Sequence, residues 1–193
     1  MIIFVKYPRS GFVKTRLAAR IGKERAVLCY SSLVNTVLNR TKSPGYQRVI
    51  FYSPESPKIK FKDWLGKDFL YYPQKGDDLG ERLMNAFKLI FKKGAKRVVC
   101  IGTDSPLIDD KIIIRAFRIL KRNECVVGPA DDGGYYLIGL SVMNEEIFKG
   151  ISWSTKKVLR QTLDKAGKQK LRYKLLAKSF DIDTYEGLRR MLY

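Results

Sequence analysis

The acidic side chains of this 193-residue chain are scarce and unevenly placed. Only 19 residues are Asp or Glu, against 38 Lys and Arg, and 11 of the 19 fall in four short regions. Those 11 are Asp77, Asp78, Glu81, Asp104, Asp109, Asp110, Asp131, Asp132, Asp181, Asp183 and Glu186. Carboxylate oxygens are the ligands that hard divalent cations such as Mg²⁺ and Mn²⁺ prefer. We therefore expect carboxylates gathered in this way to hold such a cation.

Histidine is absent from the sequence. Its absence excludes Ser–His and Cys–His catalysis and imidazole metal ligands, so a general base must be Asp, Glu, Lys, Tyr, Cys or a metal-bound water. The three cysteines, Cys29, Cys100 and Cys125, lie in apolar runs and have no CxxC spacing. This pattern is typical of reduced core residues in a cytoplasmic protein.

Basic residues crowd the segment that follows the first expected strand. Lys6, Arg9, Lys14 and Arg16 all lie there, close to the expected start of a helix at Thr15. Cations at a helix N-terminus oppose the helix dipole, so a negative group is expected to sit among them. A phosphate or diphosphate fits this position, although the segment is not a Walker A loop.

Two carboxylate segments are expected to meet at the carboxyl ends of strands. Asp104 follows the apolar run Arg97–Ile101, where a lone carboxylate can hold a cation that bridges phosphate oxygens. Asp181 and Asp183 point to one side if their segment is extended, and one of them is expected to complete the site. The alternatives are that Asp104 and Asp183 merely cap helices.

Two glycine-containing segments are expected to approach a ligand. In Asp131–Gly134, two acids precede two glycines that permit close backbone approach, with a hairpin turn as the alternative. Asp78 stands at an expected helix start, and Gly80 weakens the first turn of that helix. A contact with a bound group would explain Gly80, whereas helix capping explains most of the rest.

The apolar periodicity predicts alternating strands and helices. Strands are expected at Ile2–Val5, Arg48–Tyr52, Phe69–Tyr72, Arg97–Ile101, Glu124–Val127, Tyr135–Leu140 and Leu171–Leu176. Helices are expected at Thr15–Arg40 with a break near Gly22, at Ile59–Leu65, from Asp78 to Gly94, from Asp109 or Asp110 to Lys121, at Thr155–Ala166 and at Tyr185–Leu192. This alternation predicts a single three-layer α/β/α domain over residues 1–193 with a mainly parallel sheet. Ligands of such folds bind at the carboxyl ends of the strands.

The formal net charge of +19 is compatible with nucleic acid, an anionic membrane surface or small acidic substrates as partners. Nine basic residues face one acid between Lys156 and Lys178. A solvated face of a helix and a strand explains this stretch. Nucleic-acid binding through it is the alternative, but no RNP, KH or helix-turn-helix pattern appears. No apolar run approaches the roughly 18 residues that span a membrane, and no signal peptide is recognisable, so we expect a cytoplasmic protein without a membrane span.

Six motifs, taken together and in this order, resemble one family. They are Lys6-x-Pro8-x-x-Gly11-x-Val13-Lys14-Thr15-Arg16-Leu17, Asp78-Leu79-Gly80-Glu81-Arg82, Gly102-Thr103-Asp104-Ser105-Pro106, Gly128-Pro129-Ala130-Asp131-Asp132-Gly133-Gly134-Tyr135, Trp153-Ser154-Thr155 and Asp181-Ile182-Asp183-Thr184. The family is a bacterial and archaeal transferase family described as glycosyltransferase-like. It is associated with radical SAM and selenodomain gene clusters, including arsenosugar biosynthesis.

The resemblance implies the GT-A (nucleotide-diphospho-sugar transferase, SpsA-like) fold. More distantly, the chain is similar to the guanylyltransferases of the molybdenum and deazaflavin cofactors. It is therefore expected to be a metal-dependent transferase that binds a nucleotide or nucleotide-sugar and a small-molecule acceptor. Position 102 is Gly, so a full Asp-x-Asp triplet is missing at Asp104, and the long Gly-rich first loop of many nucleotidyltransferases is missing too. Glycosyl transfer is the first expectation, and nucleotidyl transfer with release of pyrophosphate is the alternative.

The residue patterns and the resemblance together predict roles for individual residues, and the resemblance itself implies those of Lys14, Arg16 and Asp104. The expected catalytic residues are Lys14, Asp104, Asp131 and Asp132. The expected nucleotide- or substrate-binding residues are Lys6, Pro8, Gly11, Lys14, Thr15, Arg16, Asp78, Gly80, Gly133 and Gly134. The expected ligands of Mg or Mn are Asp104, Asp181 and Asp183. A non-catalytic scaffold that kept the fold remains a further alternative, and the choice between a monomer and a homo-oligomer stays open.

Overall fold

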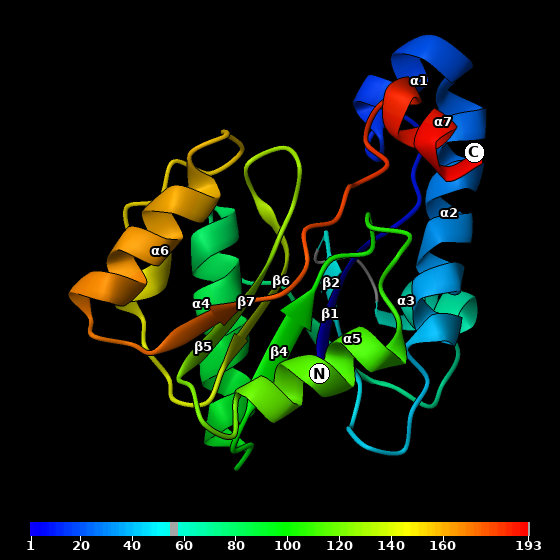
Figure 1. The fold of residues 1–193 in the computed structure, drawn as a ribbon. Coiled ribbons are helices and arrows are strands. Elements are labelled where there is room, and N and C mark those ends of the chain that lie inside the picture. Colours follow the sequence, from blue (N-terminus) through cyan, green and yellow to red (C-terminus); the bar gives the residue numbers. More distant parts are fainter. Residues whose placement is uncertain (55–57, 193) are drawn as a thin grey trace.

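The computed structural model describes residues 1–54 and 58–192. Its strands are β1 (Ile2–Lys6), β2 (Val49–Ser53), β3 (Leu70–Pro73), β4 (Val98–Ile101), β5 (Cys125–Pro129), β6 (Tyr135–Leu140) and β7 (Tyr173–Leu175). Its helices are α1 (Thr15–Ile21), α2 (Lys23–Arg40), α3 (Lys58–Leu65), α4 (Leu79–Lys92), α5 (Asp110–Ile119), α6 (Val158–Lys168), α7 (Tyr185–Leu192) and the short 3₁₀ helix η1 (Glu146–Phe148). Figure 1 shows how these elements are arranged.

The strands form one sheet in the order β3-β2-β1-β4-β6-β5-β7. β6 runs antiparallel to both of its neighbours, β4 and β5, and the other strand pairs are parallel. The predicted α/β fold with a mainly parallel mixed sheet is therefore confirmed. The strand order itself was not predictable, because long-range pairing leaves no local pattern in the sequence.

Helices cover both faces of the sheet, since successive strand residues point to opposite sides. Ile3 and Val5 of β1 belong to a core shared with residues of α2, α3 and α5. Ile2 belongs to a second core, in which Phe87 of α4 and Phe148 of η1 are buried. The result is the three-layer arrangement seen in Figure 1, with α5 on one face of the sheet and α4 on the other. No helix among the described residues is long and apolar enough to cross a membrane.

A smaller apolar cluster ties the start of the chain to its end. Leu17 of α1, Leu33 of α2 and Ile182, just before α7, are buried together. The chain reaches this cluster from β7 along the ends of other strands, because Ser179 N donates to Pro129 O and Ile182 N donates to Asp104 O, at 3.0 and 2.9 Å. This route brings the predicted acidic segment beside Asp104.

Most element boundaries agree with the prediction within two residues, and one does not. Gly22 interrupts the first long helix with φ 88°, as expected from its position. The helix predicted to start at Thr155 instead starts at Val158, so this prediction is wrong by three residues. The reason is local: Ser154 takes φ 62°, and Lys157 N donates to Thr155 Oγ1, so the chain makes a turn before the helix begins.

Candidate functional site

A cavity of about 540 Å³ lies at the carboxyl ends of β1 and β4, bounded also by β6 and the first turns of α1 and α4. Its lining includes the predicted residues Lys6, Lys14, Thr15, Arg16, Asp78, Asp104 and Asp183, which the fold therefore brings together. It also includes residues without a predicted role, among them Phe12, Gln74, Arg82, Tyr135 and Ser154. The position agrees with the rule that open α/β sheets bind ligands beyond the carboxyl ends of their strands.

Lys14 is the central cation of this cavity. It precedes α1 in the left-handed conformation, with φ 49°, and its side chain is only 2% exposed. Its ammonium nitrogen lies 2.5 Å from Oδ1 of Asp104 and 2.8 Å from Oδ1 of Asp183. Burial acts to lower the pKa of Lys14, but the two carboxylates outweigh it and raise the pKa above its usual value. Lys14 is therefore a fixed positive charge at neutral pH.

Asp181 is a third carboxylate near this pair, although it does not line the cavity itself. Its Oδ1 is buried without a hydrogen-bond partner. Burial raises the pKa of Asp181 to about 7, and the negative charges of Asp104, Asp183 and Asp132 add to the increase. A buried oxygen without a donor, close to two further carboxylates, is an arrangement that a cation would stabilise.

The donor set fits the predicted Mg or Mn. Among residues 1–54 and 58–192, no group of three or more Asp, Glu or Cys side chains is arranged to hold a metal ion as it stands. Mg²⁺ commonly uses only one or two carboxylates together with substrate phosphates and water. Asp104 and Asp183 already share one cationic group, the Lys14 ammonium, so their oxygens converge as such a site requires.

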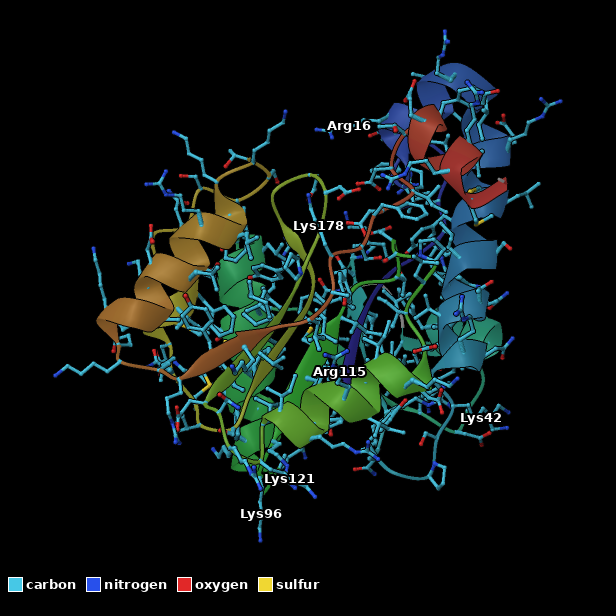
Figure 2. The ribbon with its side chains drawn as sticks, viewed as in Figure 1. Arg16, Lys42, Lys96, Arg115, Lys121 and Lys178 are labelled. Carbon is cyan, nitrogen blue, oxygen red and sulfur yellow. The ribbon has the colours of Figure 1, made fainter. Side chains whose placement is uncertain are left out.

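The rest of the cationic lining comes from the first loop and α4. Lys6, Arg16 and Arg82 line the cavity with Lys14. Figure 2 shows Arg16 extending from the α1 end of the molecule, whereas Lys96 and Lys121 lie at the opposite end. Some of the basic residues that give the net charge of +19 therefore line the cavity, and others lie far from it.

Asp78 lines the cavity but also has a structural task. Its side chain accepts a hydrogen bond from Glu81 N at 2.8 Å, and Glu81 Oε2 accepts from Asp77 N at 2.9 Å. Asp78 is thus the N-cap of α4, and the second bond holds the preceding residue, Asp77, against the first turn of the same helix. The capping explanation of this segment is therefore correct, and it leaves the second carboxylate oxygen of Asp78 for other contacts.

The predicted glycines contact the protein itself. Gly80 is buried, and a Cβ there would lie 2.5 Å from Nε1 of Trp153. A Cβ on Gly133 would collide with the backbone of Lys156. Gly134 N donates to Asp132 Oδ1 at 2.8 Å in the tight β5–β6 turn. None of these three glycines lines the cavity. Their lack of a side chain allows close packing within the protein and the tight hairpin turn, and not the expected contact with a ligand.

The remaining predicted residues also lie outside the lining. Pro8 and Gly11 belong to the first loop, where Gly11 has φ 78° and shapes the turn toward α1. Asp131 is held by Lys178 and Arg190, with N–O distances of 3.1 and 2.7 Å. Hydrogen bonds from these two cations lower the pKa of Asp131, which argues against its expected catalytic role, because a carboxylate with a lowered pKa is a weak base.

Two other groups that could act as a base are held neutral. Tyr30 lines the cavity, accepts a hydrogen bond from Lys6 N at 2.8 Å and has a pKa raised to about 12, chiefly by burial. Burial also raises the pKa of the Cys100 thiol far above its usual value. Both groups are therefore unsuited to accept a proton at neutral pH.

The basic stretch from Lys156 to Lys178 is partly explained by pairing. Arg172 donates two hydrogen bonds from its guanidinium to Glu124 within 3.0 Å, which joins the start of β7 to that of β5. Lys178 pairs with Asp131, as described above. Arg160 and Asp164 pair at 3.9 Å on the exposed face of α6. These contacts fit the explanation of a solvated helix and strand.

Comparison with known proteins identifies the class and then the family. The structure of a protein from Desulfovibrio desulfuricans, provisionally assigned as a nucleotide-diphospho-sugar transferase, is similar with a TM-score of 0.95 and 34% identity. The match covers 98% of this chain and 84% of that one, so the chain has the nucleotide-diphospho-sugar transferase fold. The model of a family described as uncharacterized proteins conserved in bacteria (DUF2064) matches residues 36–155. The chain belongs to this family.

More distant structures share the fold. CMP:2-keto-3-deoxy-manno-octonic acid synthetase in complex with CTP is 10% identical, with a TM-score of 0.60 and coverage of 98% of this chain and 95% of that one. Rv0371c of Mycobacterium tuberculosis in complex with manganese is 14% identical, with a TM-score of 0.53 and coverage of 99% and 96%. A search of curated proteins gave no match. Together the comparisons support the prediction that the chain is a transferase.

Proposed function

We propose that this protein is a metal-dependent transferase that binds a nucleotide diphosphate group in the cavity and transfers a sugar from it. The observation that carries the proposal is the ionic centre formed by Lys14, Asp104 and Asp183, with Arg16 and Arg82 on the same cavity. Carboxylates alone would repel a diphosphate. Cationic side chains alone would bind a diphosphate, and a site for the diphosphate by itself would have no use for carboxylates. The combination suits a diphosphate that arrives with a divalent cation.

The acidic and basic residues of the cavity would have different roles. Asp104 and Asp183 would hold Mg or Mn, which when bound neutralises phosphate oxygens. Lys14 and Arg16 would bind the diphosphate and stabilise the negative charge that develops on it as the leaving group departs. The pKa of Asp181 is raised to about 7, and a cation bound nearby would lower it and favour the ionised carboxylate. The fixed ammonium of Lys14 also keeps the carboxylates oriented before the substrate enters.

In sugar transfer, the acceptor forms a bond to the anomeric carbon while the bond from that carbon to the phosphate oxygen breaks. The nucleoside diphosphate leaves with the electron pair of the broken bond, and the acceptor loses its proton. In the alternative, nucleotidyl transfer, a substrate oxygen attacks the α-phosphorus of a nucleoside triphosphate and pyrophosphate leaves. A protein with this fold binds the nucleoside triphosphate CTP, and this observation supports nucleotidyl transfer as the alternative reaction.

Nucleotide screening with product analysis tests both reactions. The protein is first screened by thermal unfolding with nucleoside diphosphates, triphosphates and nucleotide-sugars, each with Mg²⁺ or Mn²⁺, because a ligand of the native state raises the apparent stability. Stabilising ligands are then incubated with candidate hydroxylated acceptors, and the products are identified by mass spectrometry. Release of a nucleoside diphosphate supports sugar transfer, and pyrophosphate supports nucleotidyl transfer. No stabilisation or turnover with any nucleotide would refute the proposal.

A further inference from the structure

Ser154 is one of the cavity-lining residues to which the charges of the site give no role. It is one of three non-glycine residues with positive φ in the described part of the chain, the others being Lys14 and Lys170. A left-handed conformation costs a serine free energy, and such residues persist where their surroundings fix them. The sequence places it in the Trp153-Ser154-Thr155 motif, to which no function was attached.

The loop around Ser154 is held on both sides. Trp153 packs into the space left by Gly80 at the start of α4. On the other side, Gly133 of the β5–β6 hairpin approaches the backbone of Lys156, and Leu159 N donates to Gly133 O at 2.9 Å. The cavity thus has a rigid wall between α4 and β6, and Ser154 belongs to it.

Two hydrogen bonds complete this support. Ser152 N donates to Gln161 Oε1, and Thr155 Oγ1 donates to Ser152 O, both at 2.7 Å. They link the loop to α6 and close it on itself. Among the described residues none forms a hydrogen bond with the exposed Ser154 hydroxyl, whereas the neighbouring hydroxyls of Ser152 and Thr155 are both hydrogen-bonded.

The cavity divides into a charged and an uncharged side. Its charged residues come from the first loop, the start of α4, the end of β4 and Asp183. The lining contributed by β6 and the Ser154 loop carries no charge and consists of Tyr135, Tyr136, Ile138 and Ser154. Phosphates belong on the charged side. The uncharged side offers aromatic surface and a hydroxyl, which suit a group that is rich in hydroxyls but neutral.

We propose that Ser154 binds a hydroxyl of the sugar that is attached to the outer phosphate of the nucleotide, with the ring of Tyr135 beside it. The Tyr135 hydroxyl is itself buried, so the tyrosine offers its ring rather than its oxygen to the cavity. This inference rests on the proposed function and adds to it the residue that distinguishes a nucleotide-sugar from the bare nucleotide. The same group would be held whether the nucleotide-sugar is the donor or the product.

Ser154→Gly is the variant that tests this role. Glycine adopts positive φ readily, so the change removes the hydroxyl without straining the backbone. Lys170→Gly is the matched control, because Lys170 has φ 54° and does not line the cavity. Affinities for UDP and UDP-glucose, and for GDP and GDP-mannose, are measured with Mg²⁺ by calorimetry for both variants and the wild type.

We expect Ser154→Gly to bind each nucleotide-sugar about five- to tenfold more weakly, as for one lost hydrogen bond, and each nucleoside diphosphate within about twofold of the wild type. Lys170→Gly should change neither. If Ser154→Gly lowers the affinities for both kinds of ligand equally, or lowers neither, the proposed role of Ser154 is wrong, but the proposed function stands. The same conclusion follows if the wild type binds the diphosphates but no nucleotide-sugar. A wild type that binds no nucleotide would overturn the proposed function as well.

Discussion

The ammonium of Lys14 lies 2.5 Å from Oδ1 of Asp104, across 90 residues of sequence. This contact joins the first loop to the end of β4, and a second bond from Lys14 extends it to Asp183 near the C-terminus. The lysine is almost fully buried, whereas the two carboxylates are about half exposed, at 44% and 48% of their side chains. The carboxylates can therefore receive a ligand from the cavity, while the lysine remains fixed beneath them.

Replacing Lys14 by Met should destabilise the metal-free protein by about 1–3 kcal/mol, because the change leaves carboxylates without their cation. Mg²⁺ should then raise the melting temperature of Lys14→Met more than that of the wild type, since the metal restores the missing charge. Lys149→Met is the control, because Lys149 pairs with Glu146 on the surface. Thermal unfolding with and without Mg²⁺ measures both effects. Equal Mg²⁺ shifts in all three proteins would show that the Lys14 position is unrelated to a metal site.

Asp104→Asn should abolish the metal-dependent part of nucleotide binding with little loss of stability. The amide oxygen can still accept a hydrogen bond from Lys14, but a neutral amide is a much poorer ligand for a hard cation than a carboxylate. We expect the affinity for a nucleoside diphosphate in Mg²⁺ to fall at least about tenfold and to match the wild type in EDTA. Asp164→Asn, on the exposed face of α6, is the control. Wild-type affinity in Mg²⁺ would exclude Asp104 as a metal ligand.

Asp181 should give the metal-free protein a characteristic pH dependence. Its pKa is raised to about 7 in the folded state, mainly by burial, from about 3.8 when exposed. Between these values the folded state binds more protons than the unfolded state, so the contribution of Asp181 to stability falls as the pH rises from 4 to 7. The loss approaches its full value above pH 7, where it amounts to roughly 4 kcal/mol at about 1.4 kcal/mol for each pKa unit.

Asp181→Asn should remove this dependence. The variant should be more stable than the wild type at pH 8 and similar to it near pH 4. Urea unfolding at several pH values in EDTA measures the difference, and Asp164→Asn again supplies a carboxylate change on an exposed face. Parallel stability curves for Asp181→Asn and the wild type would mean that Asp181 is ionised in the folded state throughout.

The sequence predicted those parts of the fold that depend on local patterns. Asp78 and Asp109 cap the helices that their positions indicated, and the break at Gly22 follows from the backbone freedom of glycine. The rule that sites form at strand ends also predicted that Asp104 and one of Asp181 and Asp183 lie close together, and Asp104 and Asp183 both pair with Lys14. These inferences need only the residues within a few positions, or the general geometry of parallel sheets.

The contacts that could not be predicted from the sequence are those between residues far apart along the chain. Asp131 looked like a free acid beside glycines, but Arg190, 59 residues later, neutralises it. Gly80 looked like a ligand contact, but its space belongs to Trp153. In both cases the local pattern correctly indicated an unusual residue. Only the tertiary packing determines whether that residue contacts a ligand or another part of the chain.

Gly80→Ala should destabilise the protein although alanine is the better helix former. The new Cβ would lie 2.5 Å from Trp153 Nε1 and 2.6 Å from Phe148 O, so the tryptophan must move, at a cost of about 1–3 kcal/mol. Gly167→Ala in α6 is the matched control, because a Cβ there meets nothing within 4 Å, and it should stabilise by up to about 1 kcal/mol. Urea unfolding of both variants gives the comparison. If Gly80→Ala were stabilised like Gly167→Ala, Trp153 would not be seated against α4, and the rigid wall that carries Ser154 would lose its support on that side.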